Sequence, residues 1–372
     1  MAGPSRDPSP LRGPLLAGLG AAVLLVAGTG ALAWLAGGEP GPAGATADIS
    51  TREPIVVAEA VAEPVDPFAQ ASAEEVSLPG VTDTETALEA APAQPAPQTR
   101  GPRAPVTGLY EPGPGGPLPI IAADGRRPDS VYAKAFDGVT DAPTISVIVG
   151  GLGLSRSLTQ RAIDTLPSEV TLSFAAYSDN LQDWIDAARA DGHEVLIELP
   201  MEPFDYPNND PGPHTLLAEA GPEENRRRLV TLLARGAGYA GVANYLGARI
   251  GAAQEPLTGV FADLEARGLS IFHDGSGRRP VLEGAAETAG AKLALADRIL
   301  DGDPDPASID ARLLELEALA LQNGTALGSG FAYPATVDTV AAWADALASR
   351  GYQLAPASYL MTLRQAESGP ET

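Results

Sequence analysis

The chain has 372 residues, of which 24 are basic and 48 acidic, so its formal net charge is −24. This charge argues against nucleic acid as a partner, because Lys and Arg side chains supply most of the affinity for phosphate backbones. Cysteine is absent, which excludes disulfides, thiolate zinc sites, iron–sulfur clusters and a cysteine nucleophile. The three histidines leave room for at most one ordinary imidazole metal site.

An uncharged apolar stretch covers residues 13–38. As a helix it would reach about 39 Å at ~1.5 Å per residue, more than the ~30 Å hydrocarbon core of a bilayer. Arg6 and Arg12 precede the stretch, and the acidic Glu39 and Asp48 follow it. The positive-inside rule therefore predicts a single-pass anchor in a bacterial inner membrane, with residues 1–12 in the cytoplasm and the C-terminal part in the periplasm.

A cleaved signal peptide is the alternative interpretation, because the small residues on either side of Leu32 resemble a cleavage site. The apolar region of a signal peptide usually runs for only ~7–15 residues, which favours the anchor. Both interpretations predict export, and the absence of cysteine suits a domain that is stable without disulfides.

Residues 39–142 are rich in proline and acidic side chains. Runs such as AAPAQPAP and EPGPGGPLP cannot hold a helix or a central strand, because proline fixes φ and removes a backbone donor. We therefore expect a disordered linker that extends through the periplasm. The segment SVYAKAF, which begins at Ser130, is the part of this linker that could dock onto the following domain.

Residues 143–362 alternate short apolar runs with amphipathic helical patterns, and residues 363–372 are expected to form a disordered tail. Eight strands are predicted, at residues 144–149, 170–177, 194–199, 240–246, 269–273, 291–296, 325–331 and 352–356. Helices between successive strands require crossover connections, which build a parallel sheet. The number of units favours an α/β fold with a distorted parallel (β/α) barrel, and an open doubly wound sheet is the alternative.

Ligands of parallel β/α folds meet the loops that follow the carboxyl ends of the strands. This rule selects the residues that end or follow the predicted strands, namely Gly150, Gly151, Glu198, Glu202, Asn244, Tyr245, Arg249, His273, Asp274 and Tyr333, with His214 in the long loop after the third strand. The run from Gly150 to Gly153 lacks both a Lys-Ser/Thr pair and full G-x-G-x-x-G spacing. Glycines that close a strand–helix turn are therefore a better interpretation than a phosphate loop.

Several segments resemble the divergent polysaccharide deacetylases, a branch of the NodB-like carbohydrate deacetylases. They are GGLGLS, GHEVLIELPMEPFDYPNNDPGPHTL, GVANYLGARI, GLSIFHDGSG and AYPATVDTVAAWADAL, and the resemblance covers residues 143–362. It implies a distorted barrel that holds a divalent metal, usually zinc, and a metal-activated water that removes acetyl groups from amino sugars.

The sequence departs from this family pattern where the metal site needs Asp and His. Gly150–Gly151 stands in place of an Asp-Asp pair, Glu198 in place of the His before Leu-Pro, and Tyr245 in place of the His after Asn. Phe331 and Tyr333 correspond to the two His that flank the Pro of a later motif. The resemblance therefore implies that the expected ligands are missing together, so we predict no metal ligands and no cofactor.

Two functions stay open for the residues that remain. His214 and His273 could, with Glu198 or Glu202, form a rebuilt metal or acid/base site. His273 and Asp274 would then be catalytic, which would keep deacetylase-like hydrolysis. The alternative is a carbohydrate-binding or scaffold protein without chemistry, in which the binding residues are Glu198, Glu202, Asn244, Tyr245, Arg249, His214 and Tyr333. In either case the expected partners are a glycan and, through the N-terminal helix, the membrane.

Three further expectations concern residues outside this set. His193 precedes the third predicted strand, so we interpret it as a packing residue at the opposite end of the barrel. Arg249 could bind a carboxylate or pair with Glu198, and Tyr177 and Tyr206 could stack on sugar rings. An acidic linker that contacts other envelope proteins is a third interpretation, supported by composition alone.

Overall fold

The computed structural model describes residues 102–139, 141–276 and 278–368. The predicted cytoplasmic segment, the predicted anchor at residues 13–38 and most of the predicted linker lie outside the described residues. Within the described ranges, no helix is long and apolar enough to cross a membrane.

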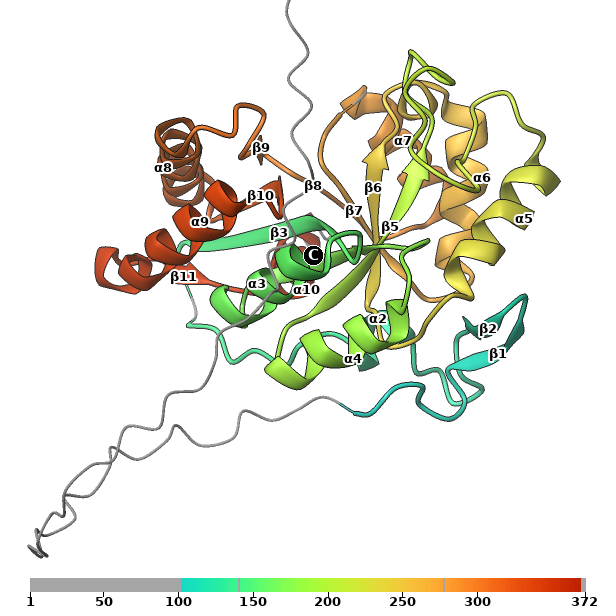
Figure 1. The fold of residues 1–372 in the computed structure, drawn as a ribbon, viewed down its shortest axis with the longest axis horizontal. Helices are drawn as coiled ribbons and strands as arrows, with labels where there is room; N and C mark the ends of the chain where they lie inside the picture. Colours follow the sequence, from blue (N-terminus) through green and yellow to red (C-terminus); the bar gives the residue numbers. More distant parts are fainter. Residues whose placement is uncertain (1–101, 140, 277, 369–372) are drawn as a thin grey trace, which may run out of the picture. The chain divides into compact units, whose positions relative to one another are not determined.

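Nine strands of the described residues form one sheet, and every pair in it is parallel (Figure 1). The strand order is β8-β7-β6-β5-β4-β3-β10-β9, and β11 also pairs with β3. The strands are β3 (Thr144–Leu152), β4 (Thr171–Ala175), β5 (Val195–Met201), β6 (Gly241–Leu246), β7 (Ser270–His273), β8 (Leu293–Leu295), β9 (Arg298–Ile299), β10 (Thr325–Phe331) and β11 (Gln353–Leu354). All eight predicted strands are present, so the predicted parallel α/β architecture is confirmed.

The sheet curls until its two edges meet. Strands β8 and β9 lie at opposite ends of the strand order, although only Ala296 and Asp297 separate them in the chain. The N–H of Ala296 donates to the carbonyl of His273 in β7 (2.8 Å), and the N–H of Asp297 donates to the carbonyl of Leu327 in β10 (2.7 Å). Two consecutive residues therefore bond to strands near opposite edges of the sheet. We call the line where these two edges meet the seam. The result is a curled, incompletely paired barrel and not an open doubly wound sheet.

Seven helices of the described chain pack on the outer face of the sheet, and an eighth closes its interior. The outer helices are α3 (Arg156–Thr165), α4 (Leu181–Asp191), α5 (Pro222–Leu233), α6 (Gln254–Glu265), α7 (Arg279–Ala289), α8 (Pro306–Asn323) and α9 (Pro334–Leu347). Alternate strand residues such as Val147 and Ile197 join this outer core, whereas their neighbours Ile148 and Leu196 face inward. This period of two is the pattern expected of strands with two buried faces.

The helix α10 (Ala357–Ser368) fills the amino end of the barrel. Its residues Ala357, Leu360 and Met361 are buried in the inner cluster with Ile148 and Leu196. The predicted disordered tail is therefore wrong for residues 363–368. These residues continue α10, whose first turns are held in the barrel by the buried apolar side chains.

The predicted disordered linker is wrong for residues 102–139. This part forms an antiparallel hairpin of β1 (Tyr110–Gly113) and β2 (Gly116–Pro119), followed by the short helix α2 (Pro128–Val131). Proline is compatible with this arrangement, because a two-stranded hairpin has only edge strands and the first position of a helix needs no N–H. Pro128 occupies such a position at the start of α2.

The same segment is anchored by a buried tyrosine. Tyr132 packs with Leu109 and Ala240 in a separate small core. Its hydroxyl accepts a hydrogen bond from the N–H of Val106 (2.9 Å), and the guanidinium of Arg189 lies 5.2 Å from its ring centroid. Tyr132 belongs to SVYAKAF, so the predicted docking of that segment is confirmed.

We expect Tyr132→Ala to lower the free energy of unfolding by about 3 kcal/mol, because it removes a fully packed ring and the acceptor for Val106. The control is Tyr110→Ala on β1, where the ring is 40% exposed and the expected loss is below about 1 kcal/mol. Urea unfolding of the full chain measures both values. Equal, small losses would contradict the assignment of residues 102–139 to the folded unit.

Candidate functional site

The carboxyl ends of the central strands enclose a narrow cavity of about 50 Å³. Its polar lining comes from Glu198 on β5, Asn244 on β6, Ser329 on β10, His273 at the end of β7 and Asp274 directly after it. About 10–15 Å³ of such space suffices for one water molecule, so the cavity has room for a few waters but not for a sugar ring.

Glu198 occupies the centre of this arrangement. Its side chain is buried, and its Oε1 accepts a hydrogen bond from the backbone N–H of Gly151 (2.8 Å). A Cβ added to Gly150 would lie only 2.0 Å from the same Oε1. The carboxyl of Glu198 therefore fills the space that a side chain at position 150 would need.

The pKa of Glu198 is raised to about 8, chiefly by burial. The hydrogen bond from Gly151 opposes this rise, and the nearby charge of Asp274 adds to it. At neutral pH the native protein therefore holds a proton on this carboxyl. A neutral carboxyl both donates and accepts hydrogen bonds, but it is a poor partner for a cation.

His273 lies beside it with one ring nitrogen bonded and the other not. Its Nδ1 lies 3.1 Å from the amide nitrogen of Gly275 and 3.2 Å from Oδ1 of Asp274. In the neutral ring, Nδ1 accepts from Gly275 and the proton resides on Nε2; in the imidazolium, Nδ1 donates to Asp274. The buried Nε2 has no hydrogen-bond partner among the described residues.

Asp274 is held by two neighbours. Its N–H donates to Oδ1 of Asn244 (2.8 Å), and its Oδ1 accepts from the N–H of Ser276 (2.7 Å). Burial acts to raise the pKa of Asp274, but hydrogen bonds from His273 and Ser276 together with the His273 charge lower it overall. The pKa of Glu198 is thus raised and that of Asp274 is lowered. Opposite pKa shifts of two neighbouring carboxyls are typical of sites where one group is protonated and the other is ionised.

Aromatic rings form one wall of the site. The rings of Tyr245 and Phe331 meet edge to face with centroids 6.0 Å apart, and Phe331 lies 6.1 Å from Tyr333. Tyr333 is 46% exposed, whereas burial, and then the charge of Glu198, raises the pKa of Tyr245. Tyr177 shares this environment, because burial and the charges of Tyr245 and Glu198 raise its pKa as well. The wall therefore runs from the buried carboxyl to the surface.

Five of the predicted binding residues are not among those that line the cavity. Two of them, Tyr245 and Tyr333, belong to the aromatic wall, and the other three are Glu202, Arg249 and His214. Glu202 is buried and accepts hydrogen bonds from Arg249 (2.8 Å) and from the N–H of Ala218 (2.6 Å), and Arg249 also pairs with Glu219. These bonds fasten the loop that follows β5. The pairing of Arg249 with Glu198, which the sequence left open, is therefore replaced by a pairing with Glu202. His214 is an exposed residue of the same loop.

His193 lies apart from the site, as predicted. Its buried ring contacts two backbone carbonyls, with Nδ1 2.8 Å from the oxygen of Val170 and Nε2 3.3 Å from that of Ile163. Burial lowers its pKa. The residue therefore joins α3 to the amino end of the sheet and has a packing role.

The residues present do not fit the divalent metal that the family resemblance implies. Within the part of the chain that the structure describes, no group of three or more His, Asp or Glu side chains is placed to hold a metal ion. In the cavity itself, Glu198 is protonated at neutral pH and bonded to Gly151, and Asp274 is bonded to Ser276. We therefore derive no step through a metal.

One supporting residue was missed from the sequence. The carboxylate of Asp301, which follows β9, accepts from the N–H of Phe331 (2.6 Å) and from the hydroxyl of Thr336 (2.8 Å). It thereby fixes the carboxyl end of β10, which lines the cavity. A two-residue strand such as β9 leaves no pattern in the sequence. A glycine inside a predicted strand, such as Gly330, indicates that another group approaches the backbone closely, and here a Cβ would lie 3.2 Å from Asp301.

We expect Gly150→Ala to lower the free energy of unfolding by about 1–3 kcal/mol, because the added methyl collides with the carboxyl of Glu198. Moving the carboxyl aside would break its bond to Gly151. In a Glu198→Ala background the same substitution should cost at least about 1 kcal/mol less, since the obstacle is gone. The control is Gly259→Ala in α6, where a Cβ meets nothing within 4 Å and helix propensity improves. Additive effects at positions 150 and 198 would contradict the contact.

Glu198 also makes stability depend on pH. Its pKa rises from 4.5 in the unfolded chain to about 8 in the native protein, so its stabilising contribution is complete below pH 4.5 and is lost as pH rises to 8. The loss is about 5 kcal/mol. Glu198→Gln removes this contribution. Burial also raises the pKa values of Glu194 and Asp301, but both proteins keep these two groups. The difference in pH dependence between wild type and variant therefore belongs to Glu198. Urea unfolding at pH 5 and 8.5 measures it, and parallel curves for the two proteins would contradict the assignment.

Comparisons with known proteins show the family of the chain. A family model described as divergent polysaccharide deacetylase matches residues 147–361, more than half of the chain. The crystal structure of the uncharacterized protein ATU2773 from Agrobacterium tumefaciens C58 is 41% identical, with a TM-score of 0.64, and the match covers 66% of this chain and 99% of that one. The uncharacterized protein YibQ from Escherichia coli K12 is 23% identical over 197 residues, which is 53% of this chain and 60% of YibQ. The chain therefore belongs to the divergent polysaccharide deacetylase family.

Proposed function

We propose that this protein binds carbohydrate in the cell envelope, at the carboxyl end of its barrel, without the metal-dependent deacetylation that the fold family implies. The observation that carries the proposal is the position of Glu198. Its protonated carboxyl fills the space over Gly150 and is bonded to Gly151. A neutral carboxyl in that position is a poor partner for a cation, so the position is unsuited to the metal that deacetylation would need.

The surroundings of the cavity support a sugar as the ligand. The exposed ring of Tyr333 and the ring of Tyr245 offer apolar faces beside polar groups, a combination that suits the alternating C–H and hydroxyl surfaces of carbohydrates. The predicted anchor at residues 13–38 supports a place in the periplasm, where envelope glycans are accessible.

Metal-independent acid–base catalysis is a second candidate. It is favoured by the opposite pKa shifts of Glu198 and Asp274 and by the unbonded Nε2 of His273. In this hypothesis neutral His273 takes a proton from a water that attacks the acetyl carbonyl, and Asp274 stabilises the imidazolium. Glu198 donates its proton to the amine as the C–N bond breaks, so the products are acetate and the free amino sugar. Activity would then be present below pH 8 and would fall as Glu198 loses its proton.

Calorimetry and acetate release with the full chain and an acetylated chito-oligosaccharide tetramer test the proposal. We expect binding, no release of acetate, and about tenfold weaker binding by Tyr333→Ala, which removes the exposed ring. Tyr110→Ala, an exposed tyrosine on the hairpin, is the matched control and should bind as the wild type does.

The other outcomes are distinct. Acetate release that EDTA abolishes, in protein with stoichiometric zinc, overturns the proposal, and so does the absence of binding. Acetate release that persists in EDTA, falls above pH 8 and disappears in His273→Asn replaces the proposal with the second candidate.

A further inference from the structure

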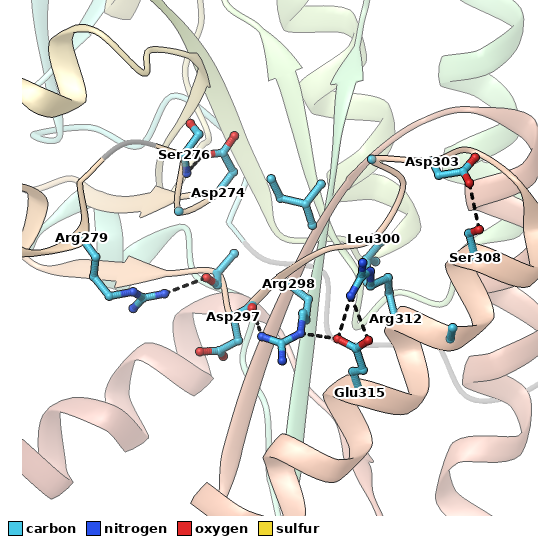
Figure 2. A pocket seen from close by; sticks show the side chains of 15 residues that line it. Asp274, Ser276, Arg279, Asp297, Arg298, Leu300, Asp303, Ser308, Arg312 and Glu315 are labelled. Carbon is cyan, nitrogen blue, oxygen red and sulfur yellow. Dashed lines mark hydrogen bonds and ion pairs between the residues drawn. The ribbon is translucent and has the colours of Figure 1, made fainter. Parts of the chain in front are cut away.

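A groove of about 770 Å³ opens along the seam where β8 and β9 part. We call it the seam groove; its walls come from the start of α7, from residues 296–300 and from the first half of α8 (Figure 2). Its volume lies within the range of about 300–1,000 Å³ that small-molecule sites occupy. The cavity at Glu198, by contrast, is too small for a sugar.

The seam groove and the Glu198 cavity are neighbours. Asp274, Ala296 and Ile299 line both of them. A ligand in the groove therefore lies against Asp274, whose Oδ1 is 3.2 Å from Nδ1 of His273. The shared residues form a common wall between the groove and the cavity.

Two of the three arginines that line the groove pair with one carboxylate. Arg298 and Arg312 both donate to the carboxylate of Glu315, the latter at 2.9 Å, and Figure 2 shows the two guanidinium groups meeting it from different elements. Arg279 donates to the carbonyl of Ala296 (3.1 Å). A strong anion such as phosphate would have to displace Glu315, so the groove is better suited to a neutral ligand.

The groups that face the groove also match a polyol. Each guanidinium carries five N–H donors in a planar fork, and the bonds to Glu315 and to backbone carbonyls use only part of them. Asp303, which accepts from Ser308 (3.1 Å), adds acceptors beside the start of α8. Ile299 also lines the groove and, at 42% exposed, offers it an apolar surface.

We propose that the seam groove binds a short neutral oligosaccharide, with Arg279, Arg298 and Arg312 donating to hydroxyl groups and Ile299 contacting a C–H face. One end of the oligosaccharide then reaches the wall that the groove shares with the Glu198 cavity. This inference rests on the proposed carbohydrate binding and names the place where the ligand lies.

The test compares binding of the acetylated chito-oligosaccharide tetramer by full-length variants that fill or weaken the groove. Ser308→Trp places an indole in the groove and should weaken binding at least tenfold. Arg312→Ala removes a donor without filling space and should weaken it several-fold. Ser349→Trp, an equal change at an exposed residue after α9, is the matched control and should leave affinity unchanged. Thermal unfolding of each variant verifies the fold, and Arg312→Ala keeps the test valid if Ser308→Trp does not fold.

The outcomes separate this inference from the function on which it rests. Weaker binding by Ser308→Trp and Arg312→Ala, with wild-type binding by Ser349→Trp, supports the groove. Wild-type affinity in both groove variants overturns it and leaves carbohydrate binding intact. Inorganic phosphate that binds to the wild type but not to Arg312→Ala overturns the choice of a neutral ligand, and a wild-type protein that binds no tetramer overturns the proposed function itself.

Discussion

The hydrogen bond from Gly151 to the buried carboxyl of Glu198 is the contact on which the rest of the site depends. It fixes the carboxyl over Gly150, so a side chain at that position collides with it. Burial outweighs this bond in its effect on the pKa, so the carboxyl keeps its proton at neutral pH. The shape and the charge of the cavity therefore follow from one carboxyl and two glycines. A carboxylate at position 150 and the present conformation of Glu198 exclude each other sterically, so the two positions must change together.

The larger features of the fold were predictable because they follow from periodicity. Buried strands such as β3 and β5 are continuous apolar runs, and the helices between them carry one apolar face. The hairpin of β1 and β2 was missed because the argument from proline excludes central strands but says nothing against an isolated edge pair. The strand β9 was missed because two residues carry no period. The barrel seam was missed with it, since the seam is defined by the pairing of β9 with β10.

The candidate site was predictable in part. The rule that ligands meet the carboxyl ends of strands selected Glu198, Asn244, His273 and Asp274, and these four residues do line one cavity. The rule gives position along the chain but not the direction of a side chain or its choice of partner. Glu202 and Arg249 follow strands as well, but each finds its partner in the other and in the loop after β5. Such pairings depend on tertiary contacts that no local pattern encodes.

The crossing from β8 to β9 has a mechanical consequence. In a barrel with a complete ladder, the edges are joined by several hydrogen bonds that can break and reform independently. Here the covalent backbone ties them, because only two residues lie between Leu295 and Arg298. Three successive Cα–Cα steps of ~3.8 Å limit their separation to about 11 Å. The circumference of the barrel is thus bounded by chain length at the point where the seam groove opens. Expansion of the barrel therefore cannot draw the end of β8 and the start of β9 further apart than this limit beside the seam groove.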